Sequence, residues 1–413
     1  MPVRKETSEV LKTSEVWGTS EVLGRGRRVV YINATGYWAG AEAMLLDLAT
    51  HLNPAQWRPL VLLPFAGPFS QALTQAGVAW RVWPLAAPRT RQDLRSGRAL
   101  LRLGLRLPPS VVRLAAWLRQ EQAALVHTNS SAALDGALAA RLAGVPHVWH
   151  ARERLPLGAP LRSLWCQAML SLSAAVVVNS RAVRSQWGSR AADPRLHVVP
   201  DGLDLSTFAP RRAAAEVRVE LGLGDGPVVG MVARIAPIKG QAIFLDAAAR
   251  LCADFPAARF VLVGGALPAY EPLRQALFAQ ANAGPLAGRV IFTGEVPRAQ
   301  APELMQVFDV LAAPTTTMEG FGLVVLEGMA LGLPVVATLG GPEDLIVEGE
   351  TGCLVPAGDA AALANALARL LRDPAHARRL GRAGHARAAS QFTLAQHVQR
   401  IETIYTVVTG QNS

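Results

Sequence analysis

The chain has 413 residues, of which 51% are apolar. This length predicts two domains, because a single hydrophobic core rarely serves more than about 300 residues. No apolar run approaches the roughly 20 residues of a membrane-spanning helix. The three cysteines lack metal-ligand spacing and do not form a disulfide framework, so we expect a reducing compartment such as the cytoplasm.

The formal net charge of +10 is unevenly distributed. Residues 24–204 contain 21 arginines, no lysine and nine acidic residues, so they carry the whole positive excess. An electropositive face suggests an anionic partner, which could be a membrane lipid, a nucleic acid or a phosphorylated acceptor.

The N-terminal segment repeats the tetrapeptide TSEV three times within residues 7–22. So short and polar a repeat has too few apolar side chains for a core, and we expect residues 1–24 to be a disordered tail. The polar, charged N-terminus does not resemble a signal peptide.

The next segments alternate between strand-like apolar runs and amphipathic helix-like runs, which predicts parallel sheets covered by helices on both faces. In the first half the predicted strands are 29–32, 59–63, 78–83, 125–128, 145–149 and 175–178. The predicted helices there are 41–51, 69–76, 111–122, 132–143 and 161–172. The segment 33–40 between the first strand and the first helix is a glycine loop.

The second half repeats this rhythm. Its predicted strands are 227–232, 259–263, 290–293, 310–312 and 333–337, and its predicted helices are 240–253, 271–281, 301–306, 323–330, 360–371, 374–392 and 394–408. We therefore expect an N-terminal Rossmann-like domain at 25–203 and a C-terminal one at 204–390. The last helix, in 391–413, is expected to pack back toward the N-terminal domain.

The stretch 314–343 holds the strongest candidate site. Glu319 and Glu327 are eight residues apart, and Gly320, Phe321 and Gly322 follow the first of them. A loop that leads into a helix offers unpaired N–H groups and the positive end of the helix dipole, which favour an anion or sugar hydroxyls. The two carboxylates can then hold different parts of one elongated ligand. The alternative is an unrelated pair of surface acids.

Three further sets of candidate residues lie near the ends of predicted strands. Arg234 and Lys239 follow a buried strand and precede a helix, where two cations suit a diphosphate. Two solvated loop cations are the alternative. His150 follows the predicted strand 145–149, although a lone histidine is more often structural. The glycine loop ends in Gly40, with Glu42 just beyond it.

Together these motifs resemble family 4 of the retaining glycosyltransferases, from about Arg27 to the C-terminus. The segment EGFGLVVLE matches the Glu-x7-Glu motif of the family, and GMVARIAPIKG contains its diphosphate-binding pair. VPDGLDLSTFAP resembles the interdomain segment, and LGGPEDLIVEGETGCLVPAGD resembles the Gly-Gly-x-x-Glu and Gly-x-Leu-Val signature. The resemblance implies the α/β fold called GT-B, in which two doubly wound Rossmann-like domains face each other across a cleft.

The resemblance also implies roles for single residues. Arg234 and Lys239 would hold the donor diphosphate. Glu319 would contact the hydroxyls of the donor sugar, and Glu327 would contact the ribose. His150 would lie near the reacting carbon, which makes it a catalytic candidate together with Arg234, Lys239 and Glu319.

The remaining donor contacts in the family come from backbone. The N–H groups of Phe321, Gly322 and Leu323 would meet sugar or phosphate, next to Gly320, and the loop at Gly40 would lie near the diphosphate and the acceptor. Two positions depart from the family pattern. Ala39 replaces a glycine of the N-terminal loop, and Asp201 replaces the usual asparagine.

The implied activity is the transfer of a hexose from a nucleotide-diphosphate sugar to a glycan or lipid-linked acceptor, with retention at the anomeric carbon. It needs no cofactor and no metal ion, and the chain has no metal-binding Asp-x-Asp at a strand end. UDP, GDP and ADP all remain open as the donor nucleotide. The alternatives are a nucleotide-sugar epimerase, an inactive scaffold, and a non-enzymatic basic protein that binds nucleic acid or membrane; no nucleic-acid module is recognisable.

An arginine-rich stretch at 89–119 suggests where the protein acts. Arg95, Arg98, Arg102 and Arg106 recur at helical spacing, with leucines between them. A basic amphipathic helix of this kind can lie in the headgroup region of an anionic membrane. We therefore expect peripheral contact with the inner face of the membrane, where Glu42 and these arginines would form the acceptor or membrane face. The alternative is a solvated helix whose leucines pack on the protein's own core.

Overall fold

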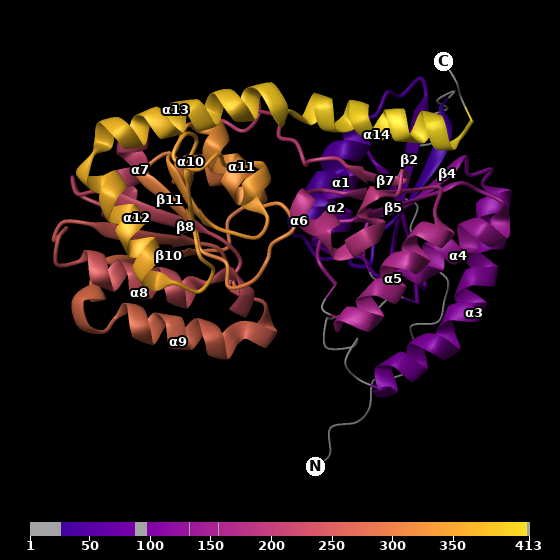
Figure 1. Ribbon diagram of the computed structural model, residues 1–413, viewed down its shortest axis with the longest axis horizontal. Helices are drawn as coiled ribbons and strands as arrows, with labels where there is room; N and C mark the ends of the chain where they lie inside the picture. The colour runs from indigo at the N-terminus through magenta and orange to yellow at the C-terminus, as the bar shows by residue number, and fades with distance from the viewer. Residues whose placement is uncertain (1–25, 87–96, 132, 156, 411–413) are drawn as a thin grey trace, which may run out of the picture. The chain divides into compact units, whose positions relative to one another are not determined.

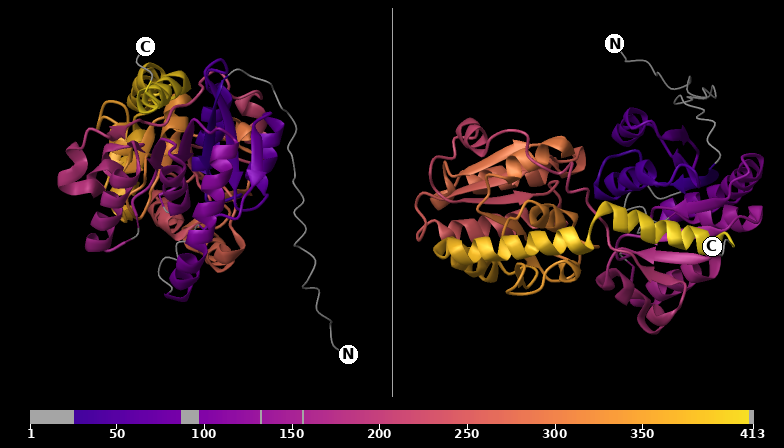
Figure 2. Two further views of the ribbon diagram at one scale, coloured as in Figure 1. Left: turned by 90° about the vertical axis from the view of Figure 1, so that its right-hand side faces the viewer. Right: turned by 90° about the horizontal axis from the view of Figure 1, so that it is seen from above.

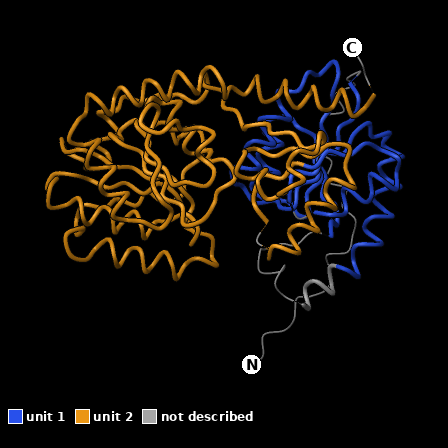
Figure 3. The backbone as a smooth tube through the Cα atoms, in the orientation of Figure 1, with its two compact units in different colours: residues 1–149 blue, residues 150–413 orange. Residues whose placement is uncertain are grey.

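The computed structural model describes residues 26–86, 97–131, 133–155 and 157–410, with side chains left out for 97–103. The predicted tail at 1–24 lies outside this range. The chain divides into two compact units, residues 1–149 and 150–413 (Figure 3).

The first sheet has seven strands in the order β3-β2-β1-β4-β5-β6-β7. Its strands are β1 (Arg27–Ile32), β2 (Trp57–Leu63), β3 (Ala79–Val82), β4 (Leu125–Thr128), β5 (His147–Ala151), β6 (Ala175–Val178) and β7 (Leu196–Val198). β1 runs parallel to both β2 and β4. A strand order that runs out in both directions from β1 is that of a doubly wound sheet.

The described part of the unit of residues 1–149 contains the helices α1 (Gly40–His51), α2 (Pro68–Gln75), α3 (Gly97–Gln120) and α4 (Leu134–Ala143). Val30 and Ile32 of β1 are fully buried, and they pack with Leu114 and Leu118 of α3 and with Ala139 of α4. This apolar contact holds α3 and α4 on one face of the sheet.

The second sheet lies within residues 150–413 and has six strands in the order β10-β9-β8-β11-β12-β13. Its strands are β8 (Val228–Val232), β9 (Arg259–Val263), β10 (Val290–Gly294), β11 (Val310–Ala313), β12 (Val335–Thr338) and β13 (Cys353–Val355). The helices of this unit are α5 (Ala159–Leu172), α6 (Arg181–Arg184), α7 (Ala214–Glu220), α8 (Gln241–Leu251), α9 (Glu271–Ala281), α10 (Ala301–Met305), α11 (Leu323–Ala330), α12 (Ala360–Arg372), α13 (Pro374–Gln391) and α14 (Leu394–Val408).

Alternate residues of the second sheet serve two separate cores. Phe260 and Leu262 of β9 pack with α8, α9 and α12, whereas Val261 and Val263 face α7, α10 and α11. Side chains of a strand point to opposite faces in turn, so this division means that helices cover both faces (Figure 1). The predicted doubly wound α/β fold is thereby confirmed.

The two C-terminal helices follow each other with a single break, as Figure 2 shows. Thr393 caps α14, because its hydroxyl accepts a hydrogen bond from the N–H of Gln396. Leu203 exchanges backbone hydrogen bonds with Phe392 and Leu394 at this break. His397 reaches the carbonyl of Pro200 at 2.8 Å. The last helix is therefore tied to residues 200–203.

Most of the predicted elements match to within two or three residues, but some predictions were wrong. The predicted helix 111–122 begins at Gly97 instead, and α3 continues through Pro108 and Pro109. Proline disfavours a helix interior, so the local pattern does not predict one continuous helix across this pair. The short strands β7 and β13 and the short helices α6 and α7 were not predicted, since three to seven residues carry little periodicity.

Candidate donor-binding site

The candidate residues of the second half gather at the carboxyl ends of β8 and β11. These two strands are neighbours, and the strand order runs outward from them in opposite directions. This is the topological switch point of the sheet, where open α/β sheets bind their ligands. Arg234 and Lys239 lie in the loop after β8, and Glu319 lies in the loop after β11.

The two loops are joined by backbone contacts. The N–H of Thr316 donates to the carbonyl of Ile238 at 3.0 Å. Gly240 has φ of +76°, and a Cβ atom there would overlap the carbonyl oxygen of Pro314. Only glycine allows this approach and this φ together. As a result, the half-exposed Lys239 forms an ion pair with Glu319.

Arg234 is exposed at the start of the same loop, and its carbonyl accepts a hydrogen bond from Gln241 at 3.0 Å. Arg234 and Lys239 thus share one loop. Of these two cations, Lys239 is the one that pairs with the Glu319 carboxylate in the described part of the chain.

The helix α11 begins beside this ion pair. Its N-cap is Gly322, with φ of +91°, and no side chain of the described part of the chain caps it. Phe321 is buried and lies 6.0 Å from Phe392 between ring centroids, which anchors the loop. The N–H groups of Leu323 and Val324, at the start of α11, are therefore available for an anion, whereas that of Val325 already donates to the carbonyl of Gly322.

Glu327 lies one turn into α11, is 8% exposed, and forms an ion pair with Arg298 at 3.6 Å. Arg298 follows β10 on the same sheet. Arg298 was not among the predicted site residues. A cation five residues beyond the predicted strand 290–293 was the available signal, because all these strand ends meet at one edge.

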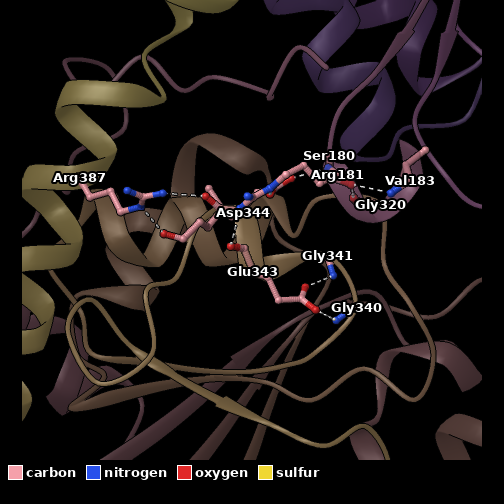
Figure 4. A network of polar contacts seen from close by, with 10 residues as sticks. Ser180, Arg181, Val183, Gly320, Gly340, Gly341, Glu343, Asp344 and Arg387 are labelled. Carbon is pink, nitrogen blue, oxygen red and sulfur yellow. Dashed lines mark hydrogen bonds and ion pairs between the residues drawn. The ribbon is translucent and has the colours of Figure 1, made fainter. Parts of the chain in front are cut away.

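Glu343 shapes a second glycine loop at this edge. Its carboxylate accepts hydrogen bonds from the N–H groups of Gly340 and Gly341, at 2.8 and 2.5 Å. A Cβ atom on Gly341 would lie 2.9 Å from the carbonyl oxygen of Glu319. The loop therefore packs against the backbone of Glu319. Figure 4 shows Gly340, Gly341 and Glu343 of this loop.

His150 lies in β5, and its side chain is fully buried. Its ring stacks on that of His397, with 6.3 Å between centroids. Burial lowers the pKa of His397 below its ordinary value. The backbone two residues beyond His150 touches the donor loop, because a Cβ on Gly320 would overlap the carbonyl of Arg152, and Ser180 donates to the carbonyl of Gly320.

Asp201 stands where the family pattern has asparagine, and the structure gives it a charged partner. It forms an ion pair with Arg152, and the two side chains are 6% and 8% exposed. Asn179 donates to its other oxygen at 3.2 Å. The carboxylate thus neutralises a buried guanidinium, which a neutral asparagine would not do.

The remaining candidates lie in the unit of residues 1–149. Gly40 is the first residue of α1, as expected to within one residue. Glu42 is buried and accepts a hydrogen bond from Asn33 at 3.1 Å. Arg95 lies outside the described residues. Arg98 and Arg102 lie in α3, as the predicted helical face requires, but their side chains are outside the description.

Two kinds of feature are absent from the described residues. No helix among them is long and apolar enough to cross a membrane. Within the same residues, no three histidine, cysteine, aspartate or glutamate side chains gather closely enough to hold a metal ion.

Comparison with known families matches both halves of the chain. Residues 38–207 match the model described as Glycosyltransferase Family 4, and residues 226–373 match that of Glycosyl transferases group 1. The chain therefore matches glycosyltransferase models in both of its halves, with family 4 in the first half. This confirms the resemblance drawn from the Glu-x7-Glu motif and its neighbours.

Solved structures of glycosyltransferases share the fold. The Anabaena protein Alr3699/HepE, crystallised in complex with UDP, is 26% identical with a TM-score of 0.79, covering 92% of this chain and 100% of that one. The same protein in complex with UDP-glucose gives a TM-score of 0.77. These neighbours show that the fold is GT-B.

Curated relatives are similar over part of their length. A GDP-mannose-dependent alpha-(1-6)-phosphatidylinositol monomannoside mannosyltransferase of Mycolicibacterium smegmatis is 36% identical over 50% of this chain and 55% of its own. The lipopolysaccharide core biosynthesis mannosyltransferase LpcC of Rhizobium leguminosarum bv. viciae is 29% identical over 64% of this chain and 79% of its own. The chain spans about half the length of the first of these relatives.

Proposed function

We propose that this protein is a retaining glycosyltransferase that moves a hexose from a nucleotide-diphosphate sugar to a glycan or lipid-linked acceptor. One observation carries the proposal. Lys239 and Glu319, from the loops after two adjacent strands, meet as an ion pair beside the uncapped start of α11, at the switch point of the second sheet. Cations and free N–H groups at one point favour a diphosphate, and a carboxylate beside them favours sugar hydroxyls.

In this proposal each candidate has one task. Lys239 and Arg234 bind the diphosphate and stabilise the charge that develops on the leaving group. Glu319 fixes Lys239 before the donor arrives and accepts hydrogen bonds from the sugar. Glu327 accepts hydrogen bonds from the ribose, and Arg298 holds its carboxylate in place.

The remaining groups position the sugar. The N–H groups of Phe321, Gly322 and Leu323 meet a phosphate or a sugar hydroxyl, next to Gly320. His150 lies near the reacting carbon, and the loop at Gly40 lies near the diphosphate and the acceptor. The leaving phosphate takes the proton of the acceptor hydroxyl, so that positioning and charge stabilisation supply the rate enhancement. We propose that no cofactor and no metal ion take part, and that transfer continues in EDTA.

The names of two relatives suggest two candidate donor substrates. GDP-mannose is named for the mycobacterial relative, and UDP-glucose is bound by the Anabaena protein. Both relatives with named acceptors act in phosphatidylinositol mannoside or lipopolysaccharide synthesis. We infer that the product belongs to a cell-surface polysaccharide or glycolipid.

The test is sugar transfer and donor hydrolysis from GDP-mannose and UDP-glucose by the parent and two variants. Lys239→Ala and Arg234→Ala should each lower turnover about 10²–10³-fold, the usual effect of removing one preorganised group that stabilises developing charge. Arg250→Ala removes an exposed cation from α8 of the same sheet and should leave turnover unchanged. Near-parental rates in both site variants would overturn the proposal. Inversion of the donor sugar at C2 without transfer would favour the epimerase.

We further propose that the acceptor is lipid-linked and that the protein works at the cytoplasmic face of the membrane, bound through α3. Leu105 and Val112 of this helix are 71% and 59% exposed, and the adjacent Arg106 and Arg113 are exposed too. Apolar side chains with arginines beside them match an interfacial amphipathic helix.

A further inference from the structure

Arginines from three elements line a pocket that contains none of the candidate donor-site residues. The pocket has a volume of about 470 Å³ and lies within residues 150–413. Arg181 and Arg184 come from α6, Arg387 comes from α13, and Arg400 comes from α14. Asp344 is the one acidic residue of its lining. Four positive charges therefore stand against one negative charge.

The one acidic side chain of the lining, Asp344, is already paired with Arg181. The carboxylate of Asp344 accepts a hydrogen bond from the N–H of Arg181 at 2.6 Å and forms an ion pair with the guanidinium of the same residue. The hydrogen bond from the Arg181 guanidinium to Asp344 and the charge of Asp344 raise the pKa of Arg181 above its ordinary value. The charges of Arg184, Arg387 and Arg400 have no such partner among the described residues.

Two of these arginines are held in place by backbone carbonyls. Arg387 donates to Leu345 at 2.7 Å and to Asp344 at 3.0 Å (Figure 4). Arg184 donates twice to Ala191, at 2.8 and 2.6 Å. In both guanidinium groups only Nε and Nη2 make these bonds, so Nη1 makes none to the described part of the chain. Fixed guanidinium groups with N–H groups to spare bind phosphate oxygens well.

The rest of the lining fits a ligand larger than a bare phosphate. Ser390, Gln391 and Gln396 add hydroxyl and amide groups, while Val198, Pro200 and Phe392 offer apolar contact. The Ser390 hydroxyl already donates to the carbonyl of Arg387, and the Gln396 amide already bonds to Ser390 and Thr393, so each keeps only part of its hydrogen-bonding capacity for a ligand. A volume of about 470 Å³ lies within the usual range for small-molecule sites. Polar groups of this kind suit hydroxyls, and the arginines suit a phosphate.

We propose that this pocket binds the phosphate of a phosphorylated polyol, either as a free sugar phosphate or as the headgroup of a lipid. The site is independent of the proposed activity. Its wall continues into the donor loops, because Glu343, next to Asp344, holds Gly340 and Gly341 against the backbone of Glu319. A bound anion would therefore restrain the segment that supports Glu319.

The test uses the full-length Lys239→Ala variant as background, because it weakens the candidate diphosphate site. Isothermal titration with glucose 6-phosphate should show binding in the millimolar range or tighter, whereas glucose should not bind. Adding Arg400→Gln should raise Kd about tenfold, the effect of about 1.4 kcal/mol. Arg400 is exposed and makes no hydrogen bond to the described residues, so this variant should keep the parental Tm.

Arg382→Gln is the matched control, since it removes an exposed arginine of α13 that does not line the pocket. It should leave Kd within about twofold, since a distant surface charge contributes little. Amide hydrogen exchange of residues 340–345 should slow when glucose 6-phosphate is bound.

The same variants then separate the two sources of phosphate. Vesicles of phosphatidylcholine with and without phosphatidylinositol show whether a lipid headgroup binds in an Arg400-dependent way, and competition by glucose 6-phosphate shows whether the free ester takes the same site. Inorganic phosphate, used alone, measures how much the polyol adds. Absence of binding to every phosphate probe would overturn the proposal, and so would equal weakening by Arg400→Gln and Arg382→Gln. Neither result depends on sugar transfer.

Discussion

Lys239 and Glu319 show how a single pair can organise a site. An ammonium and a carboxylate that are 30% and 14% exposed are only partly screened by water, so each fixes the direction of the other. In the proposed function a donor diphosphate would join this pair instead of meeting a disordered lysine. Pre-positioned charge requires little reorganisation during the reaction.

Glu327 offers the sharpest test of donor binding at the level of one residue. Glu327→Ala should weaken binding of the donor nucleotide by about 1.5–3 kcal/mol, the usual effect of losing a hydrogen bond to a charged group. Titration with GDP and UDP measures it. Glu350→Ala, which removes an exposed acid from a turn, is the control. If the Glu327 variant binds the preferred nucleotide as tightly as the parent, the ribose role is wrong.

Two buried histidines predict how stability depends on pH. Burial lowers the pKa of His147 to about 3 and lowers that of His397 as well. A group whose pKa is lowered on folding stabilises the fold above its unfolded pKa, near 6.5, and that contribution is lost as the pH falls. The free energy of unfolding should therefore decrease as the pH falls below 6.5, by up to roughly 1.4 kcal/mol per pH unit for each histidine. For His147 this decrease continues to about pH 3.

Urea unfolding at several pH values measures this slope. His147→Gln should make it shallower by the contribution of one proton, whereas His51→Gln, at an exposed position, should leave it unchanged. An unaltered slope in the His147 variant would mean that this ring is not the group that takes up the proton.

Among the elements, the loops after β8 and β11 depend on close contact between backbones. Gly240→Ala would place a Cβ against the carbonyl of Pro314 and would also strain a left-handed backbone. Gly332→Ala is the matched control, because Gly332 has φ of +71° with open space around its Cβ position.

The control should lower the free energy of unfolding by about 1–2 kcal/mol, the cost of the left-handed conformation alone. Gly240→Ala should lower it further and should also weaken donor binding, since the loop has to move. Thermal unfolding and nucleotide titration provide both readings. Equal destabilisation in the two variants, with donor binding intact, would show that the contact with Pro314 is not needed.

The helix α3 carries the membrane prediction. We expect the parent protein to sediment with anionic vesicles but not with neutral ones, and to be released by salt. Charge reversal at Arg95, Arg98 and Arg102 should abolish sedimentation, and Leu105→Asp should weaken it, because Leu105 is largely exposed. Charge reversal at Arg378, Arg379 and Arg382 of α13 is the control. Equal recovery in the supernatant with both lipids at low salt would instead favour a soluble acceptor.

At the scale of the molecule, the sequence predicted what depends on local pattern. Alternating apolar runs located the strands, and the Glu-x7-Glu motif located α11 without error. Local spacing predicted helix on both sides of Pro108 and Pro109 but not one helix through them, because the packing of Leu114 and Leu118 is a tertiary effect. The contacts of Glu327 with Arg298 and of His150 with His397 join residues 29 and 247 positions apart. Sequence spacing carries no information about such pairs.

The three cysteines are free and buried, so the rate at which each reacts with a thiol reagent depends on local opening of the fold. Burial raises the pKa of Cys166 to about 11 and raises those of Cys252 and Cys353 too, so the reactive thiolate is scarce while the fold is closed. Cys166 lies in α5, whereas Cys252 follows α8 and Cys353 lies in β13 of the second sheet.

A thiol reagent should therefore label each cysteine only as fast as its surroundings open. In the Cys166→Ala variant, labelling of the two remaining cysteines would report the opening of the second-sheet region alone, and a donor nucleotide should slow this labelling. In the Cys252→Ala, Cys353→Ala double variant, labelling of Cys166 would report the opening of the α5 region alone. Immediate labelling of Cys166 in the native protein would contradict its burial.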